Sequence, residues 1–411
     1  MDRIAYIFGE TFIYWSSIIL TMAAVSAVCL FLFFYLNKEK NVVAAATVIP
    51  LSVVFSLVFA RFMHWYCRAD SYFSFVSAMT DYSSGGYALL GVFAGCALAA
   101  VIVRVTKITE NLPSLLDSMS LAGCAGIAVG RLSCFFNTQD RGQIIASTQS
   151  LPWVYPVTNS VSGVQEYRLA TFVIQAMVTA VVFAALFVFA VRTREKRRDG
   201  DLTLFFLLLY GATQVVLDST RYDSLFFRSN GFISIVQVVS ALATGLACVI
   251  FSVRLVRRHG FQKWYVGLWV LFAAFVGLGC YMEYHVQRHG DQPVFAYSFM
   301  SLALTGMVAV VIAIWLLAER NAPHMDVPSG REKTEMPGIL RKKAKKAKKE
   351  KKAGISLVSR WGAESKPAFS DRKKEEKAEL PKTEETNPLP EEDVYIPLDA
   401  LGLPEDFFWE D

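Results

Sequence analysis

Long apolar runs separated by polar segments recur through the first 318 residues of the chain. Each run has roughly the 20 residues that an α-helix needs to cross the hydrocarbon core of a bilayer. The runs in series predict an all-α polytopic integral membrane protein with about nine transmembrane helices. They cover residues 12–36, 43–62, 86–103, 112–131, 169–191, 202–220, 232–253, 264–283 and 296–318.

The composition of the 411-residue chain agrees with this prediction and excludes an ordinary soluble domain. Hydrophobic residues make up 54% of the chain and charged residues 19%, with a mean hydropathy of +0.37. Soluble domains average about 45–50% apolar and about 25% charged residues. The seven cysteines are scattered without a CxxC pair, so we expect neither a disulfide framework nor a zinc site. No other metal and no cofactor is expected.

Basic residues recur in every second polar segment, and this pattern predicts the orientation. Lys38 and Lys40 follow the first run, Arg104 and Lys107 follow the third, and residues 192–198 follow the fifth. Basic residues also follow the seventh and ninth runs. By the positive-inside rule, the N-terminus lies outside and the C-terminal tail lies in the cytoplasm. The first run is expected to remain as a helix, because it is too long for a signal peptide and no small-residue cleavage site follows it.

Lysine and arginine separate between the two predicted sides of the membrane. All five lysines before Ala318 fall in predicted cytoplasmic segments, whereas the nine cations on the predicted outer side are all arginine. A guanidinium is a rigid fork that binds phosphate or carboxylate through two parallel hydrogen bonds. We therefore favour an anion-binding cavity open to the outer leaflet, with snorkelling to the headgroups as the alternative. The nine are Arg3, Arg61, Arg68, Arg131, Arg141, Arg168, Arg221, Arg228 and Arg288.

Four segments in order along the chain carry a family resemblance. Gly130-Arg131 leads through an aromatic-rich turn to Asn137 and Gly142. Arg61 ends the second apolar run, a glycine-rich stretch covers residues 84–95, and the sixth run carries further polar residues, namely Gln214, Asp218 and Arg221. The ordered set resembles the signature of the prolipoprotein diacylglyceryl transferases, over about residues 10–255.

The resemblance implies a transferase of the bacterial plasma membrane. Such enzymes move the diacylglyceryl group of phosphatidylglycerol to the thiol of a lipobox cysteine in a prolipoprotein, so that glycerol phosphate leaves and a thioether remains. The resemblance implies catalytic roles for Arg131, Asp218 and Arg221, with the arginines holding the phosphate and offsetting charge on the departing oxygen. Gln214, Asp218 and Arg221 share one face of their helix. Substrate-binding roles are implied for Arg61, Arg131, Asn137, Gln139, Gly142 and Gln214.

The chain departs from the family signature at several polar positions. Where the family has a histidine at the start of its third helix, this chain has Leu90, and His64 is a candidate substitute as proton acceptor. The alternative is a catalytically degenerate relative that binds phospholipid or lipoprotein as a non-enzymatic partner. Transport is disfavoured, because no run shows broken mid-membrane helices. The other departures are Ser16, Cys134, Gln139, Gln214 and Asp218.

The chain is expected to have three parts. Residues 1–262 form a seven-helix transferase-like core, residues 263–318 add two transmembrane helices, and residues 319–411 form a disordered, charged cytoplasmic tail. Arg341–Lys352 holds nine basic residues in twelve, whereas only acidic charges follow Lys382. The basic block is expected to meet the anionic inner leaflet or the chain's own acidic end. Expected partners are phosphatidylglycerol, the prolipoprotein lipobox segment, membrane lipids and a partner for the tail, but no nucleic acid.

Overall fold

The structure is a computed structural model of the whole chain. The chain divides into two units, Met1–Met325 and Asp326–Asp411, and all the described residues belong to the first. The predicted tail beyond Glu319 therefore lies outside the described part of the chain. The residues described are 4–8, 11–80, 85–137, 139–145, 154–158, 163–193, 197–228, 230–288 and 293–319.

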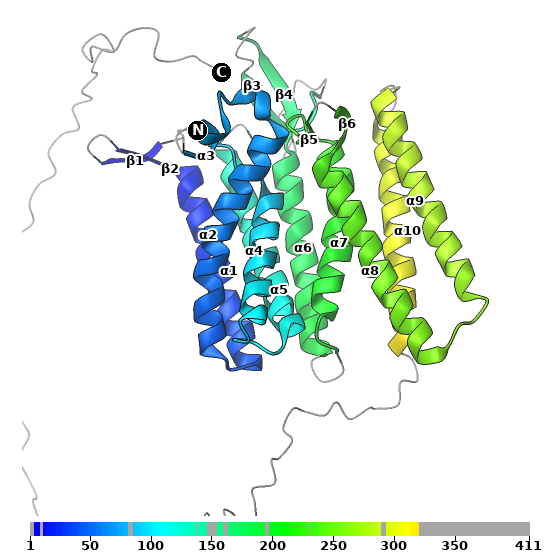
Figure 1. Cartoon of the computed structure of the whole chain (residues 1–411). Helices are drawn as coiled ribbons and strands as arrows, with labels where there is room; N and C mark the ends of the chain where they lie inside the picture. Colours follow the sequence, from blue (N-terminus) through cyan, green and yellow to red (C-terminus); the bar gives the residue numbers. More distant parts are fainter. Residues whose placement is uncertain are drawn as a thin grey trace, which may run out of the picture. The chain divides into compact units, whose positions relative to one another are not determined.

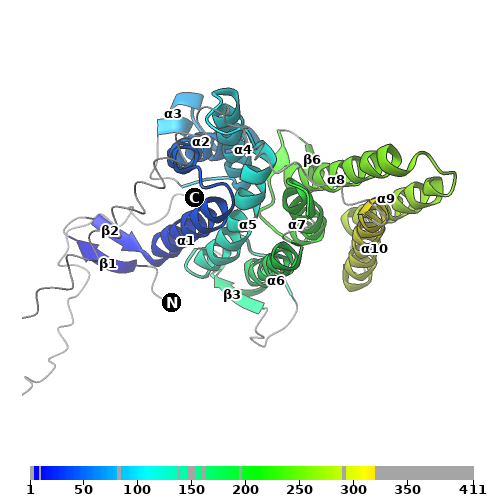
Figure 2. The same cartoon turned by 90° about the horizontal axis from the view of Figure 1, so that it is seen from below.

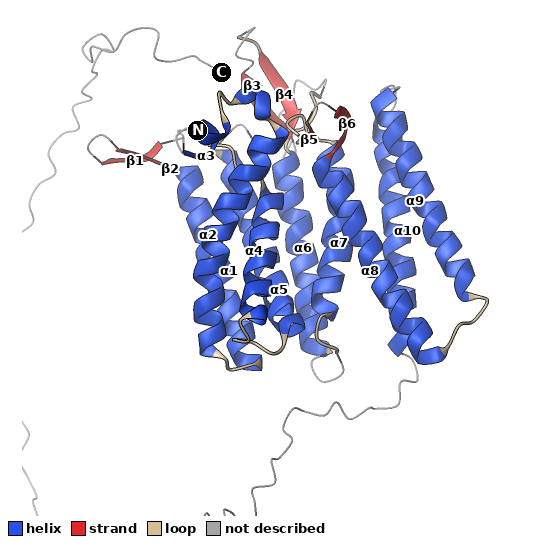
Figure 3. Cartoon of the chain, in the orientation of Figure 1, coloured by secondary structure: helices blue, strands red, loops and turns tan. Residues whose placement is uncertain are grey.

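Every one of the predicted apolar runs forms a helix (Figures 1 and 3). Eight helices are long and apolar enough to cross a membrane, so the prediction of a polytopic membrane protein is confirmed. α4 has only 17 residues and falls short of that length. The helices are α1 (Trp15–Lys38), α2 (Val42–Cys67), α4 (Leu89–Val105), α5 (Leu112–Gly130), α6 (Thr171–Arg192), α7 (Asp201–Ser219), α8 (Ile235–His259), α9 (Tyr265–Arg288) and α10 (Pro293–Glu319).

The chain is mostly helical but not all-α, which corrects the sequence-based prediction. Three antiparallel two-stranded hairpins and the short helix α3 (Phe75–Thr80) lie among the helices. Three of the predicted runs begin within strands, because an apolar strand that leads straight into an apolar helix cannot be separated from it by hydropathy. The hairpins are β1–β2 (Ile4–Phe8, Thr11–Tyr14), β3–β4 (Val154–Thr158, Gln165–Leu169) and β5–β6 (Phe226–Phe227, Asn230–Ser234).

The three hairpins and α3 gather at one end of the helices, which we call the hairpin end (Figure 1). Successive long helices run in alternating directions, so that α2, α5 and α7 finish at the hairpin end. Short connections join the helices at the opposite end, which carries Lys38, Lys40, Lys107 and Lys263. These four lysines and the hairpins are therefore at opposite ends of the bundle.

Small residues allow close packing between neighbouring helices. α4 lies against α2 (Figure 2), and a Cβ added at Gly91 or Gly95 would come within 2.5 Å of the α2 backbone. Close backbone approach through glycine and alanine is the usual way that membrane helices associate, because lipid tails are as apolar as the helices themselves. α9 and α10 also pack on each other, and there Gly306 leaves room for the ring of Phe275.

Side chains that cap the helices fix where the chain turns at the hairpin end. α8 begins with a capping box, in which the Ser234 hydroxyl accepts from the backbone N–H of Gln237 and the Gln237 side chain accepts from the backbone N–H of Ser234. The same two side chains also reach α7, because the Ser234 hydroxyl donates to Asp218 and the Gln237 amide donates to the Val215 carbonyl at 3.2 Å. These bonds hold the start of α8 beside the end of α7.

Candidate functional site

The loop after α5 carries the Gly-Arg motif and packs across two other helices. Arg131 opens a short 3-10 helix, Arg131–Phe135, directly after α5. Further along, the backbone N–H of Gly142 donates to the Leu169 carbonyl at 2.8 Å, and that of Gln143 donates to the Thr220 carbonyl at 3.1 Å. These bonds bring the motif to the start of α6 and the end of α7.

Asp140 joins the two arginines that the motifs predicted to act together. Its carboxylate pairs with Arg131 Nη1 through one oxygen and with Arg221 Nη2 at 2.6 Å through the other. The side chains of Arg131, Asp140 and Arg221 are only 13%, 9% and 11% exposed. Asp140 adopts a left-handed backbone with φ of 56°, which Asp tolerates better than most residues. The site is therefore built around a buried carboxylate shared by two guanidinium groups.

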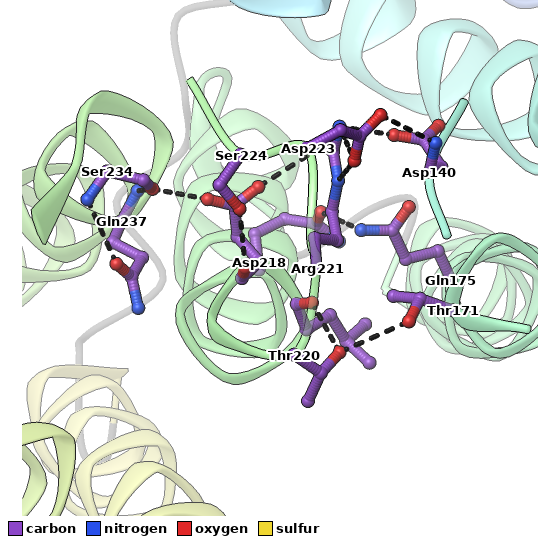
Figure 4. Close-up of polar contacts among 12 residues, drawn as sticks. Asp140, Thr171, Gln175, Asp218, Thr220, Arg221, Asp223, Ser224, Ser234 and Gln237 are labelled. Atoms are coloured by element: carbon purple, nitrogen blue, oxygen red, sulfur yellow. Dashed lines mark hydrogen bonds and ion pairs between the residues drawn. The ribbon is translucent and has the colours of Figure 1, made fainter. Parts of the chain in front are cut away.

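Two further carboxylates complete the arrangement around Arg221. Asp218 Oδ1 lies 3.2 Å from Arg221 Nη1, and its other oxygen accepts from the hydroxyl of Ser234 (Figure 4). Asp223 accepts from both Nε and Nη2 of Arg221, at 3.1 and 3.0 Å. We call Arg131, Asp140, Asp218, Arg221 and Asp223 the arginine–carboxylate cluster.

The two arginines of the cluster differ in how many of their donors the carboxylates use. Arg221 donates to carboxylates from all three of its guanidinium nitrogens. Among the residues that the structure describes, Arg131 gives only Nη1 to a carboxylate, and its side chain also lies against Tyr210 of α7. With two guanidinium groups and three carboxylates, the cluster has a formal charge of about −1 when all are ionised. Because fewer of its N–H donors are used by carboxylates, Arg131 is the arginine of the cluster better able to bind an incoming anion.

Electrostatics keep Asp140 charged in this setting. Burial alone would raise the pKa of Asp140, but the adjacent Arg131 and Arg221 outweigh it and hold that pKa well below its usual range. Burial likewise opposes the charge of Arg221, and the carboxylates of Asp140, Asp223 and Asp218 together raise its pKa above the ordinary value. Asp140 and Arg221 are therefore both charged at physiological pH.

Arg141, next to Asp140, holds the turn of the motif in shape. Its buried guanidinium donates from Nη2 to the carbonyls of Cys134 at 2.8 Å and Asn137 at 2.6 Å. It also stacks against the rings of Tyr155 and Phe172, 4.1 and 4.5 Å from their centroids. Arg141 therefore fixes the path of the chain from Arg131 to Asp140.

Gly142 occupies a position where only glycine fits. A Cβ there would lie 2.6 Å from both Leu169 Cβ and Thr171 Oγ1, and 3.0 Å from the Leu169 carbonyl. The backbone pairs with Arg221 in an isolated antiparallel bridge. The lack of a side chain at Gly142 therefore lets the motif loop lie directly against Leu169 and Thr171.

Other residues that the motifs singled out lie apart from the cluster. Arg61, 2% exposed, donates to the carbonyls of Ala78 and Gly86 and lies over the ring of Tyr72. It braces the segment between α3 and α4. His64 lies one turn further along α2, and its Nδ1 atom shares a hydrogen bond of 2.8 Å with the hydroxyl of Tyr72.

The remaining predicted binding residues divide between the motif loop and the helix interior. Asn137 uses its side-chain oxygen to accept from the backbone N–H of Gln139 at 3.0 Å, which stabilises the turn, and the Gln139 side chain is exposed. Gln214 is buried between α6 and α7, where it accepts from Gln175 at 3.4 Å. The predicted face of Gln214, Asp218 and Arg221 therefore contributes two of its three members to the cluster.

Sequence reasoning missed two members of the cluster, Asp140 and Asp223, and also Ser234, whose hydroxyl donates to Asp218. Asp140 stands two residues before Gly142 inside the motif, and its acidic side chain between two segments with arginine is a signal that could have been used. Among the residues that the structure describes, no group of three or more His, Cys, Asp or Glu side chains is arranged to hold a metal ion.

The fold and the cluster define a polytopic helical membrane protein with a buried arginine–carboxylate site at one end of its helices. The sequence model for prolipoprotein diacylglyceryl transferase matches residues 3–253. The chain therefore belongs to the prolipoprotein diacylglyceryl transferase family, and the resemblance on which the sequence analysis relied is confirmed.

Several relatives are named phosphatidylglycerol–prolipoprotein diacylglyceryl transferases, and each matches this chain over most of its own length. A phosphatidylglycerol–prolipoprotein diacylglyceryl transferase of Finegoldia magna is 26% identical over 259 residues, 62% of this chain and 96% of the relative. Those of Streptococcus pneumoniae and Lactococcus lactis subsp. cremoris are 26% and 25% identical, and the matches cover 61% and 63% of this chain and 93% and 97% of the relatives. The matched family region ends within α8, before α9 and α10 begin.

Proposed function

We propose that this protein transfers the diacylglyceryl group of phosphatidylglycerol to the thiol of a lipobox cysteine in a prolipoprotein. The observation that carries the proposal is that the buried carboxylate of Asp140 forms ion pairs with both Arg131 and Arg221, within a chain that belongs to the transferase family. Two oriented guanidinium groups beside a membrane surface suit a substrate whose leaving group carries a phosphate.

The reaction forms a carbon–sulfur bond and breaks a carbon–oxygen bond. The cysteine sulfur attacks the glyceryl carbon that bears the phosphodiester, the electron pair of the broken bond stays on the oxygen of the departing glycerol phosphate, and the thiol proton leaves to water. Negative charge grows on that oxygen in the transition state. A guanidinium already fixed in place stabilises the growing charge without having to reorganise, which is why fixed donors accelerate such steps.

We propose Arg131 as the group that contacts the phosphate and Arg221 as its partner. Arg131 has donors that the carboxylates do not occupy, whereas Arg221 is held by Asp140, Asp218 and Asp223. Asp218, anchored by Ser234, would orient Arg221. Substrate-binding roles for Arg61, Asn137, Gln139, Gly142 and Gln214 remain proposals, and the bracing contacts of Arg61 and Asn137 suit residues that shape the site.

Purified wild-type protein is expected to convert a lipobox peptide and phosphatidylglycerol to the thioether-linked lipopeptide. Mass spectrometry of the peptide measures the gain of the diacylglyceryl mass, and release of glycerol phosphate should match it one to one. A peptide with Ser in place of the lipobox Cys is the control. Lipid binding without any product, by a folded protein in phosphatidylglycerol-containing vesicles, would contradict the proposed activity.

We propose that the hairpin end faces outwards from a bacterial plasma membrane and that the tail is cytoplasmic. The separation of lysines from the hairpin end supports this orientation, because basic residues accumulate on the cytoplasmic side. In this arrangement α4 also crosses the membrane, so that the described part of the chain has nine transmembrane helices. Residues 1–262 would form the transferase core, residues 263–318 the added pair of helices, and residues 319–411 a charged tail near the inner leaflet.

A reporter fused after Asp411 is expected to reveal this orientation in living bacteria. A green fluorescent protein fused there should fluoresce, whereas alkaline phosphatase at the same position should be inactive, because each folds on only one side of the membrane. The same reporters fused before Met1 should give the reverse result. An active phosphatase at the C-terminus would show that the orientation is inverted.

A further inference from the structure

Tyr297 of α10 contacts the site although α10 lies outside the matched family region. Its hydroxyl donates to the backbone carbonyl of Ser219 at 3.2 Å. The same hydroxyl accepts from the side-chain amide of Gln143 at 3.3 Å. One added helix therefore bonds to two segments that lie far apart in sequence.

Both of these segments carry members of the arginine–carboxylate cluster. Ser219 is the last residue of α7, directly after Asp218 and two residues before Arg221. Its carbonyl is one of the helix-end carbonyls that no backbone N–H of the same helix can reach. Gln143 follows Gly142 on the motif loop, and its own N–H is bonded to Thr220. The Tyr297 hydroxyl thus adds a side-chain link where the loop with Asp140 meets the end of α7.

Packing on both sides holds Tyr297 in place. Its neighbour Ala296 and Met300, one turn further along, are fully buried, in a cluster that includes Ala212 of α7 and Met282 of α9. The arrangement of α7, α8, α9 and α10 is seen along the helix axes in Figure 2.

The far end of α10 is also fixed. Arg258 of α8 donates to the Ala318 carbonyl at 2.7 Å and pairs with Glu319 at 2.9 Å. Because α10 is packed along its length and bonded at its last turn, Tyr297 is presented by a rigid element.

We propose that Tyr297 is a positioning residue for the arginine–carboxylate cluster, so that the added pair of helices supports the site and does not merely enlarge the bundle. The inference rests on the proposed function for its kinetic test. Tyr297 acts through the Ser219 carbonyl and Gln143, which set the placement of Arg221 and Asp140. Small displacements of positioned groups slow a reaction without weakening substrate binding to the same extent.

The test compares Tyr297→Phe with Ser298→Ala. The first change removes only the hydroxyl that reaches the site. The second removes a neighbouring hydroxyl of α10 that bonds within its own helix, to the Val294 carbonyl at 2.7 Å. We expect Tyr297→Phe to lower kcat by roughly threefold to tenfold, as the loss of one hydrogen bond allows, with KM and Tm unchanged. Ser298→Ala should match wild type in all three.

A second variant tests whether Tyr297 acts through the motif loop. Gln143→Met removes the amide that donates to Tyr297 and keeps the length of the side chain. Because the two groups share one hydrogen bond, the effects of Tyr297→Phe and Gln143→Met on kcat should be less than additive in the double variant. Fully additive effects would overturn the proposed link to the loop.

Hydrogen exchange separates this proposal from the proposed activity. Amide exchange of residues 139–145 and 220–223 should be faster in Tyr297→Phe than in wild type, and unchanged in Ser298→Ala. This measurement needs no turnover, so it decides the structural link even if the wild-type protein makes no product. Exchange in Tyr297→Phe equal to that of wild type, or an active variant with wild-type kcat, would overturn the proposal.

Discussion

Arg131→Gln is expected to lower kcat for diacylglyceryl transfer on the order of 100- to 1000-fold, the loss seen when one charge-stabilising donor is removed from an active site. Arg131 is buried, is fixed by Asp140, and has donors that no carboxylate in the described part of the chain occupies. Its loss should appear mainly in kcat, because charge on the leaving oxygen develops only in the transition state. Rates measured with the lipobox peptide at saturating phosphatidylglycerol test this.

Two companion variants make the Arg131 result specific. Arg131→Lys keeps the charge but loses the planar fork, so an intermediate rate is expected. Arg288→Gln removes an exposed arginine at the end of α9 and should leave the rate unchanged. If Arg131→Gln retained more than a third of the wild-type rate, Arg131 would not contact the phosphate and its role would be confined to the ion pair with Asp140.

Asp140→Asn is expected to destabilise the protein by about 3–5 kcal/mol, the usual result of leaving a buried charge without its partner. Asp140 is the carboxylate that pairs with Arg131, whereas Arg221 keeps Asp218 and Asp223. Asn tolerates the left-handed backbone of this position as well as Asp does, so the change isolates the charge. Unfolding of purified protein in detergent should show the loss as a lower Tm.

The pH dependence of the Asp140 variant follows from its lowered pKa. A carboxyl with a pKa lower in the folded state contributes stability that is fully present above its unfolded pKa, about 3.9. That contribution falls as the pH drops through the folded value. The stability difference between wild type and Asp140→Asn should therefore be constant from about pH 5 upwards and shrink below about pH 4.

Asp223→Asn is the matched control for this variant. Asp223 is 24% exposed and shares Arg221 with two other carboxylates, so its loss should have a much smaller effect on Tm. Equal destabilisation by the two variants would mean that Asp140 does not stabilise the cluster more than Asp223 does.

The helical part of the fold could be predicted from the sequence, and the hairpins could not. Each helix could be predicted from its apolar run, because hydropathy depends only on residues that are close together in the chain. Phe12 and Ile13 belong to the strand before α1, yet they are as apolar as the helix that follows. Strand pairing depends on a partner segment, which the local pattern does not contain.

The members of the arginine–carboxylate cluster were predicted in part, for a related reason. Arg131, Asp218 and Arg221 were identified from motifs, and the structure brings all of them into one cluster. Arg61 and Gln214 were grouped with them by order along the chain, but each contacts other segments. Tyr297 had no motif to mark it, since it lies beyond the family match and contacts the site only through the packing of α10 on α7.

The sequence by itself determined the class of the protein and its family. Long apolar runs are sufficient to predict transmembrane helices, because in lipid a helix satisfies the backbone hydrogen bonds of such a segment internally. Only the tertiary structure decided that Arg131 and Arg221 share Asp140, and that an added helix reaches the same site. Segments that are about 80 residues apart meet there through backbone hydrogen bonds between the motif loop and the end of α7. An ion pair depends on distance in space, and that distance is set by the whole fold.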